Sequence, residues 1–358
     1  RSIAIGDAAL QTQNFTSATE VYNVAVGYAA GASVTTGTYN TLIGGLAGDS
    51  ITTGVRNTTM GYASGGQLTT GSYNVALGMA TLGATTTQSN NTAVGYEALN
   101  QNRAADNTAV GYFALNVNTT GTLNVALGTG ALDANTTANA NTAIGYAALG
   151  ANTTGTENTS LGYNSGAAVT TGIYNTLAGS RSGDAITTGT RNVAFGYSAL
   201  TADTVGSRAV AIGYEALATQ NFTSATDNYN IGIGFQAGYA VTTGVQNTII
   251  GGLAGDALTI GSYNIAIGYA ALGSEDSRGR AVAVGYNALA TQNADADSYN
   301  TAVGFEAGKL VSTGVQNTII GGLAGDAITT GSYNSLVGVN AGGALTTGAQ
   351  NVAFGQGA

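Results

Sequence analysis

The sequence predicts an all-β fold in which short parallel strands stack as the coils of a solenoid, and three observations lead to this prediction. A glycine that ends a motif like Asn-Thr-Ala-Val-Gly recurs 21 times, and the interval from Gly27 to Gly44 is repeated almost everywhere. The three residues before this glycine are usually β-branched, small and aliphatic in turn, which is typical of a strand. A repeat this short cannot hold a strand–helix–strand unit, which takes about 30 residues. Each copy therefore contains strands and turns only, and packs on its neighbours.

The strand is expected at the second to fourth positions of each coil. We number coils from 1 to 17 with the recurring glycine at position 5, as in Gly44, Gly111, Gly145, Gly213, Gly251 and Gly321. This glycine should be required by a positive φ or by a lack of room for Cβ. Position 1 is Asn in 18 of 21 copies, with Asn107, Asn141, Asn247 and Asn317 among them. We expect these side chains to bond from coil to coil as a structural ladder.

Positions 9 and 12 vary together and predict a narrow core. Position 9 is Leu or Gly in all 20 copies that reach it. Coils with Gly carry an aliphatic residue at position 12, as in Gly48 with Ile51, whereas coils with Leu carry a polar one, as in Leu115 with Asn118. Two branched side chains would overfill a small interior and none would leave a void. Both positions should therefore face the same region of the coil interior.

Positions 13 to 15 often read Thr-Thr-Gly and are expected to close the coil as a turn. Three coils are longer than the others, namely those that run from Gly6 to Gly27, from Gly213 to Gly234 and from Gly285 to Gly304. We expect the added segments, around 13–16, 220–223 and 292–295, to bulge outward on one face. The candidate surface-contact residues are Asn14, Phe15, Asn221, Phe222 and Asn293.

The composition excludes several classes of function. The chain has no His, Cys, Pro or Trp, so the usual zinc sites, disulfides and Ser–His or Cys–His pairs are absent. Nine Lys and Arg in a chain of net charge −9 do not form a nucleic-acid patch. No stretch of 18 apolar residues could span a membrane as a helix. We therefore expect no catalytic residues, no cofactor, no metal site, no nucleic-acid partner and no membrane insertion within this segment.

Two groups of fibre proteins have similar repeats. Residues 2–6, 209–213 and 281–285 resemble the Ser-Val-Ala-Ile-Gly head repeat of trimeric autotransporter adhesins. Residues 107–115 are similar to repeats in bacteriophage tail fibres. The resemblance covers the whole chain. It implies a left-handed parallel β-roll, three chains side by side, and an extracellular place on a virion fibre or a bacterial surface. Residues 1–358 are then one continuous repeat region and a piece of a longer fibre protein.

Two features have both a structural and a functional interpretation. Residues 321–329 resemble the nonapeptide of calcium β-rolls, and Asp49, Asp256 and Asp326 hold equivalent places. Calcium sites of that kind need consecutive nonapeptides, so we expect these aspartates to serve tight turns instead. A column of Tyr residues after the core glycine could bind sugars, but packing between chains is the expected role.

These observations favour a non-enzymatic fibre segment, tail-fibre-like, that mediates attachment to a host cell surface through a glycan or protein partner. The alternative is the head of a bacterial surface adhesin. An ice-binding solenoid is suggested by the Thr columns, although those residues lie beside a turn glycine. A depolymerase would need a carboxylate pair formed between chains. Because both faces of the strands look buried, we also expect a parallel homo-oligomer, for which the resemblance implies a trimer.

Overall fold

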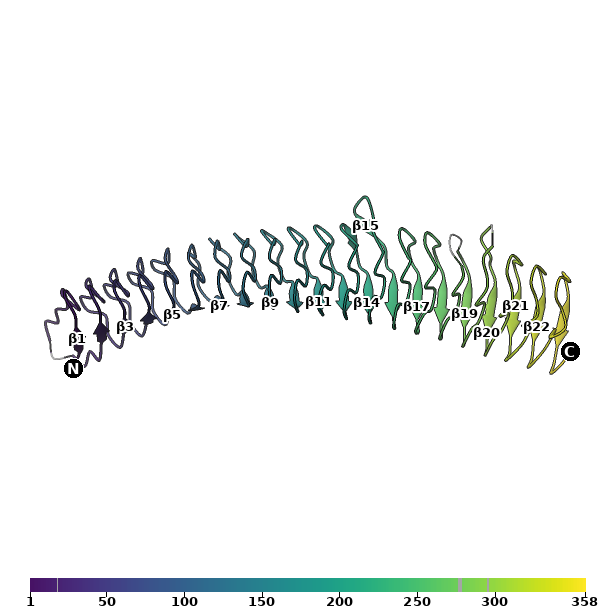
Figure 1. The fold of residues 1–358 in the computed structure, drawn as a ribbon, viewed down its shortest axis with the longest axis horizontal. Coiled ribbons are helices and arrows are strands. Elements are labelled where there is room, and N and C mark those ends of the chain that lie inside the picture. Colours follow the sequence, from purple (N-terminus) through teal and green to yellow (C-terminus); the bar gives the residue numbers. More distant parts are fainter. Residues whose placement is uncertain (18, 276–278, 295) are drawn as a thin grey trace. The chain divides into compact units, whose positions relative to one another are not determined.

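The computed structural model describes residues 1–358 except 18, 276–278 and 295, and it is a parallel β-solenoid (Figure 1). No helix occurs among the described residues. The predicted all-β class is thus confirmed, and so is the predicted length of the repeating coil. The contacts within the chain define two compact units, residues 1–175 and 176–358, and each unit is described by itself.

The first unit holds ten strands of three residues, and each strand occupies positions 2 to 4 of its coil as predicted. Each strand pairs in parallel with the next one along the chain, so that Thr108 of β7 lies opposite Val125 of β8. The strands are β1 (Ile3–Ile5), β2 (Val24–Val26), β3 (Thr41–Ile43), β4 (Thr58–Met60), β5 (Val75–Leu77), β6 (Thr92–Val94), β7 (Thr108–Val110), β8 (Val125–Leu127), β9 (Thr142–Ile144) and β10 (Thr159–Leu161).

The second unit repeats this arrangement and adds a small separate ladder. Its main strands are β11 (Thr176–Ala178), β12 (Val193–Phe195), β14 (Val210–Ile212), β16 (Ile231–Ile233), β17 (Thr248–Ile250), β18 (Ile265–Ile267), β19 (Val282–Val284), β20 (Thr301–Val303), β21 (Thr318–Ile320), β22 (Ser335–Val337) and β23 (Val352–Phe354). The extra pair is β13 (Gly206–Ser207) with β15 (Thr226–Asp227), and β15 projects from the stack of coils in Figure 1.

The middle residue of each strand faces the coil interior. From β2 to β22 every three-residue strand buries this residue, while the residues at positions 2 and 4 are half-buried or exposed. Ala25 and Leu42, for example, pack with Val34 and Ile51 in one hydrophobic cluster. The core therefore runs through the coils as a narrow column, to which each coil contributes its position 3 and a few further side chains, and positions 2 and 4 form the outer face of the sheet.

The predicted compensation between positions 9 and 12 is confirmed. Leu115, Ile51 and nearly all of the other aliphatic residues at these two positions are fully buried; the exceptions are Leu10, which is 8% exposed, and Leu345, which is partly buried. A Cβ added to Gly48 would lie 2.7 Å from Cδ1 of Ile51 and 2.9 Å from Cδ2 of Leu42. The two positions therefore compete for one volume. Position 3 shares it, because each of the ten coils with Leu at position 9 has Ala at position 3.

The polar residues at position 12 form an interior ladder that the sequence pattern did not predict. Nδ2 of Asn118 donates to Oδ1 of Asn102 at 2.6 Å, and Asn135 donates to Asn118 at 2.9 Å. Asn152 donates to Asn135 at 3.0 Å, and all four side chains are fully buried. Burial of an amide costs little when each donor has an acceptor, so this ladder fills the space that an aliphatic side chain fills in the other coils.

Candidate functional surface

The recurring glycine is required for both of the predicted reasons. Gly251 has a φ of +134°, and an added Cβ would lie 2.5 Å from the carbonyl oxygen of Gly268 in the next coil. A side chain at this position would push adjacent coils apart. The same positive φ and close approach occur at the other predicted glycines, Gly44, Gly111, Gly145, Gly213 and Gly321.

The asparagines at position 1 form the predicted ladder. Oδ1 of Asn141 accepts a bond from the backbone N–H of Asn158 at 2.9 Å, and its Nδ2 donates to the carbonyl oxygen of Gly155, also at 2.9 Å. Asn107, Asn247 and Asn317 make equivalent bonds, with the same 2.9 Å between Asn264 N and Asn247 Oδ1. These side chains are buried and hold the coils in register, so they are not available to a ligand.

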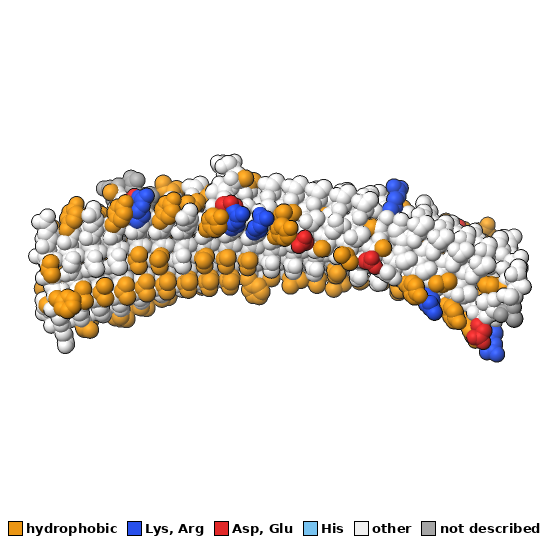
Figure 2. Space-filling view, turned by 180° about the vertical axis from the view of Figure 1, so that it is seen from behind, with side chains coloured by type: hydrophobic (Ala, Val, Ile, Leu, Met, Phe, Trp, Pro, Cys, Tyr) orange, Lys and Arg blue, Asp and Glu red, His pale blue; other side chains and the backbone are white. Residues whose placement is uncertain are grey.

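The outer face of the sheet is apolar and solvent-exposed in the single chain. Position 4 carries exposed aliphatic side chains such as Leu127, Ile144 and Ile320, and position 2 carries Val125 and Ile265. Figure 2 shows such apolar side chains gathered in rows with few charged groups beside them. Monomeric proteins seldom expose contiguous apolar surface of more than a few hundred Å², so these rows have the character of an interface.

A column of aromatic rings borders this face at position 6. Tyr96 stacks on Tyr112 with ring centroids 5.4 Å apart, and in the second unit Tyr197 stacks on Tyr214 at 5.3 Å. The rings are about half exposed. A hydrogen bond to Glu97 raises the pKa of Tyr96, and the negative charge of Glu215 raises that of Tyr214. Stacked, half-exposed rings of this kind are suited to cover by another surface.

A second aromatic column occupies position 17 and includes arginines. Arg56 lies between the rings of Tyr39 and Tyr73, 5.4 Å from each centroid. Arg280 lies between Tyr263 and Tyr299 at 5.6 Å from each. Cation–π contacts of this kind contribute about 0.5–1 kcal/mol at exposed sites. The guanidinium groups of Arg56 and Arg280 thus already contact aromatic rings of the same chain.

The candidate contact residues of the longer coils divide into surface and interior groups. Asn14, Asn221 and Asn293 are exposed, and Phe15 is partly buried. Phe222, however, is only 5% exposed, so its expected place on the surface is wrong. Its ring is apolar, and burial removes it from water. The three asparagines stand at position 13, where their backbone N–H groups bond to the next coil, and Asp295 lies outside the described residues.

The longer coils also solve a bonding problem. They are the three coils that lack Asn at position 1, having Ser2, Ala209 or Ala281 instead, and the three that carry Gln at position 12. Oε1 of Gln220 accepts from Nδ2 of Asn230 at 2.9 Å. Oε1 of Gln292 accepts from Asn300 at 2.8 Å. In these two coils the glutamine thus supplies the acceptor that the missing asparagine would have provided, whereas Gln13 of the first long coil donates to Ser2.

The aspartates of the calcium-like motif lie in turns. A Cβ added to Gly66 in the next coil would lie 3.7 Å from a carboxylate oxygen of Asp49. One added to Gly273 would lie 3.4 Å from a carboxylate oxygen of Asp256. Burial raises the pKa of both Asp49 and Asp256, against the opposing effect of backbone N–H groups. No group of three or more acidic side chains in the described part of the chain is placed to hold a metal ion.

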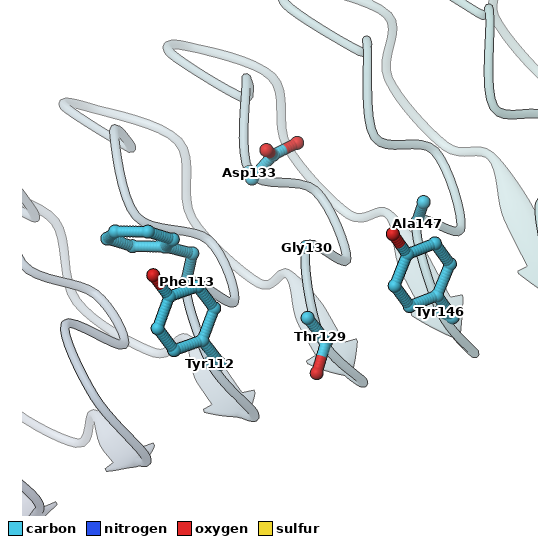
Figure 3. Close-up of a pocket in the computed structure, with 7 residues that line it drawn as sticks. All are labelled: Tyr112, Phe113, Thr129, Gly130, Asp133, Tyr146 and Ala147. Atoms are coloured by element: carbon cyan, nitrogen blue, oxygen red, sulfur yellow. The ribbon is translucent and has the colours of Figure 1, made fainter.

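One hollow of about 230 Å³ lies where the aromatic column of the first unit is interrupted. Thr129 stands at position 6 in place of a tyrosine, and Tyr112 and Tyr146 of the coils on either side border the gap (Figure 3). Asp133 contributes a carboxylate to its wall, and partial burial raises the pKa of that group. The hollow is thus lined by two phenol rings and one acceptor, with no cation among its lining residues.

Comparison with family models, with curated proteins and with solved structures gave no match to this chain. No helix in the described residues is long and apolar enough to cross a membrane.

Proposed function

We propose that this chain is a segment of an attachment fibre, without enzymatic activity, that presents its surface to glycans or proteins of a host cell. Such a segment acts outside the cell, on a virion fibre or a bacterial surface. The observation that carries the proposal is the sheet face formed by positions 2 and 4, which is exposed or half-exposed in both units and carries an apolar residue at position 4 of each strand. A surface repeated in this way suits assembly along a fibre axis and multivalent contact.

The proposed assembly is a parallel homotrimer of left-handed coils. Positions 2 and 4 of each chain would pack against a second copy, since the coil interior already covers position 3. Exposed residues such as Leu127, Ile144 and Ile320 would then be buried by the same contact, repeated in successive coils, rather than by a single binding site. The trimer and the left-handed winding derive from the resemblance to adhesin heads and tail fibres.

The internal bonding of the chain favours a mechanical role. The buried asparagines at position 1 bond successive coils to one another, and the aromatic columns add stacking on the outside. Each contact is repeated at the strand spacing of about 4.8 Å. A load along the coil axis would be shared by many identical bonds. The second candidate, a bacterial adhesin head, is supported by the same features and differs in what the chain is attached to.

Immunogold electron microscopy separates the two candidates. An antibody raised against residues 1–358 would be applied to virions and to bacterial cells from the source material. Gold on the virion fibres supports the tail-fibre role, and gold on the bacterial envelope supports the adhesin. Label confined to the cell interior would contradict both forms of the proposal.

A further inference from the structure

The aromatic column at position 6 is interrupted in a regular way. Five coils carry Asp at position 10, namely those with Asp49, Asp133, Asp184, Asp256 and Asp326. The same five coils carry a small residue at position 6, in order Gly45, Thr129, Ser180, Gly252 and Gly322. No coil combines an aromatic residue at position 6 with Asp at position 10. Asp at position 10 is therefore always accompanied by a missing ring, whereas Met79 and Val339 mark coils that lack both the ring and the aspartate.

The backbone does not require these gaps. A Cβ added to Gly45 would meet only the ring of Tyr62, at 3.6 Å, and one added to Gly252 would meet only that of Tyr269, also at 3.6 Å. These are ordinary van der Waals distances. A Cβ on Gly322 would meet nothing within 4 Å. The contrast with the glycine at position 5 is complete, since that residue has no room for a side chain.

The size of the position-10 side chain does not require the gaps either. Asn100 has nearly the shape of an aspartate, and its coil carries Tyr96 at position 6. Asn116 likewise shares a coil with Tyr112. The carboxylate, rather than the volume of the side chain, is thus the property that accompanies a missing ring.

Three of these gaps, at Gly45, Thr129 and Gly252, have an aromatic residue at position 6 of both neighbouring coils within the same unit. From this juxtaposition we propose that each of these three gaps is a binding slot for one pyranose ring of a neutral glycan. At Thr129 the flanking rings of Tyr112 and Tyr146 stand two coils apart, about 10 Å at the usual strand spacing. The space between these two rings is therefore the space that one further ring would occupy (Figure 3). The hollow of about 230 Å³ is smaller than the ~300 Å³ typical of drug-sized pockets, and it suits a single sugar unit.

The chemistry of the slot favours a neutral sugar over other ligands. The C–H faces of a pyranose would lie against the rings of Tyr112 and Tyr146, and its hydroxyls would donate to the carboxylate of Asp133. The lining has no Lys or Arg, and the chain carries a net charge of −9, so an anionic ligand would be repelled. A compact cation would fill only part of the space between the rings of Tyr112 and Tyr146.

The slots recur along the chain and suit a polymer. In the first unit Gly45 and Thr129 are five coils apart, which corresponds to about 24 Å at the strand spacing. Weak single-ring contacts at such intervals would add up along an extended glycan. The inference rests on the proposed attachment role and narrows its partner from a glycan or protein to a neutral glycan.

The test fills the slots with the residue that most other coils carry. Binding of the full chain to cellohexaose, chitohexaose and galactohexaose would be measured by isothermal titration and saturation-transfer NMR. We expect the wild type to bind at least one, and the variant G45Y/T129Y/G252Y to bind it at least tenfold more weakly. Circular dichroism and melting should show the variant to be folded. Met79→Tyr places a ring at a column position without an aspartate, and should leave binding unchanged.

Three results would overturn the slot. They are no binding of the wild type to any of the three sugars, undiminished binding by the folded filled variant, and binding of tetramethylammonium in place of the sugars. Failure here is distinguishable from failure of the proposed function. If immunogold places the chain on fibres but the chain binds none of the three sugars, the sugar slot is refuted and the attachment role is retained. If the chain binds sugar in its slots but is found only inside cells, the attachment role is refuted and the sugar slot is retained.

Discussion

Position 9 has a left-handed backbone whether it holds Leu or Gly, with φ of 51° at Leu115 and 56° at Gly48. A leucine there carries a conformational cost of about 1–2 kcal/mol. Burial of its side chain contributes about 1.5–3 kcal/mol, which outweighs that cost where the interior is open. Where position 12 already fills the interior, glycine removes both the strain and the clash. The choice at this residue is therefore set by the space that its neighbours leave.

Gly251→Val should destabilise the chain, because the new side chain meets both a positive φ and the carbonyl oxygen of Gly268. The expected loss is about 3 kcal/mol, in the range of strained backbone sites combined with overpacking. Urea unfolding and hydrogen exchange across β17 and β18 would measure it. The matched control is Gly252→Val, whose Cβ meets only Tyr269 at 3.6 Å. Equal stability of the two variants would contradict the assignment.

Acidification should stabilise the chain between neutral pH and about pH 4. Burial raises the pKa of Asp203 above its ordinary value of 3.8, although Gln220 and backbone N–H groups oppose the shift. A raised pKa means that the folded chain binds the proton more readily than the unfolded chain, so stability falls as pH rises through the folded-state pKa. Asp49, Asp133 and Asp256 are shifted in the same direction, whereas the exposed Glu306 is shifted the opposite way by Lys309.

The melting temperature should therefore be higher near pH 4 than at pH 7. Asp203→Asn removes the most deeply buried carboxylate of this set and should flatten the dependence. Differential scanning calorimetry of both proteins across this range provides the comparison. A wild type that melts at steadily lower temperature on acidification, or a variant with the same slope, would show the sign to be wrong.

A single coil is one of two interchangeable packing solutions, and the type of each coil can be changed. The interior asparagine ladder of the first unit ends at Asn152, whose buried Oδ1 has no hydrogen-bond partner. The next coil is of the glycine type, with Ser160 at position 3, Gly166 at position 9 and Val169 at position 12. An asparagine at position 12 of that coil would offer its Nδ2 to the Oδ1 of Asn152.

Gly166→Leu alone should overfill this coil and cost about 1–3 kcal/mol. The triple change S160A/G166L/V169N converts it to the leucine type and should restore stability to within about 1 kcal/mol of wild type, since it also continues the ladder. Chemical unfolding of the wild type, the single variant and the triple variant tests the idea. A triple variant less stable than the single one would show that the two solutions are not interchangeable.

Loss of one asparagine from the position-1 ladder should lower the free energy of unfolding strongly in the middle of the chain and only slightly in the last coil. Asn141→Ala leaves the buried backbone N–H of Asn158 without its acceptor, at about 1–3 kcal/mol, and removes one of the two donors to the carbonyl of Gly155, the other being Asn152. Asn351→Ala is the control, since this partly buried side chain only donates to Asn334 and Ala349. Thermal melts of the two variants should differ clearly. Indistinguishable melts would remove the ladder from the sources of stability.

The elements could be predicted well from the sequence because the same residue types recur at the same coil positions. Strands at positions 2 to 4, the glycine constraint and the exchange between positions 9 and 12 all follow from local spacing. The interior ladder through Asn102 and Asn118 was missed, because its partners belong to different coils and the packing rule for position 12 concerned only its aliphatic side chains. The burial of Phe222 was missed because the added segment of its coil was expected to bulge outward. The replacement of Asn by Gln in longer coils was visible as a co-occurrence in the sequence.

At the scale of the whole molecule, the chain covers its interior but leaves its outer sheet face open. Charged residues make up only 8% of the sequence, so little of the surface is protected by charge. The rows at positions 2 and 4 repeat in register through β1 to β10 and again through β11 to β23. A face of this kind is covered most simply by a second copy, because the same repeat then meets itself coil by coil.

Sedimentation velocity at micromolar concentration shows whether copies of the chain cover this face. We expect a single species of three chain masses. Val110→Lys together with Ile144→Lys places charges at position 4 of β7 and β9, and should weaken the assembly without disturbing the interior. A wild-type chain that sediments as a dispersed monomer would contradict the proposed homo-oligomer.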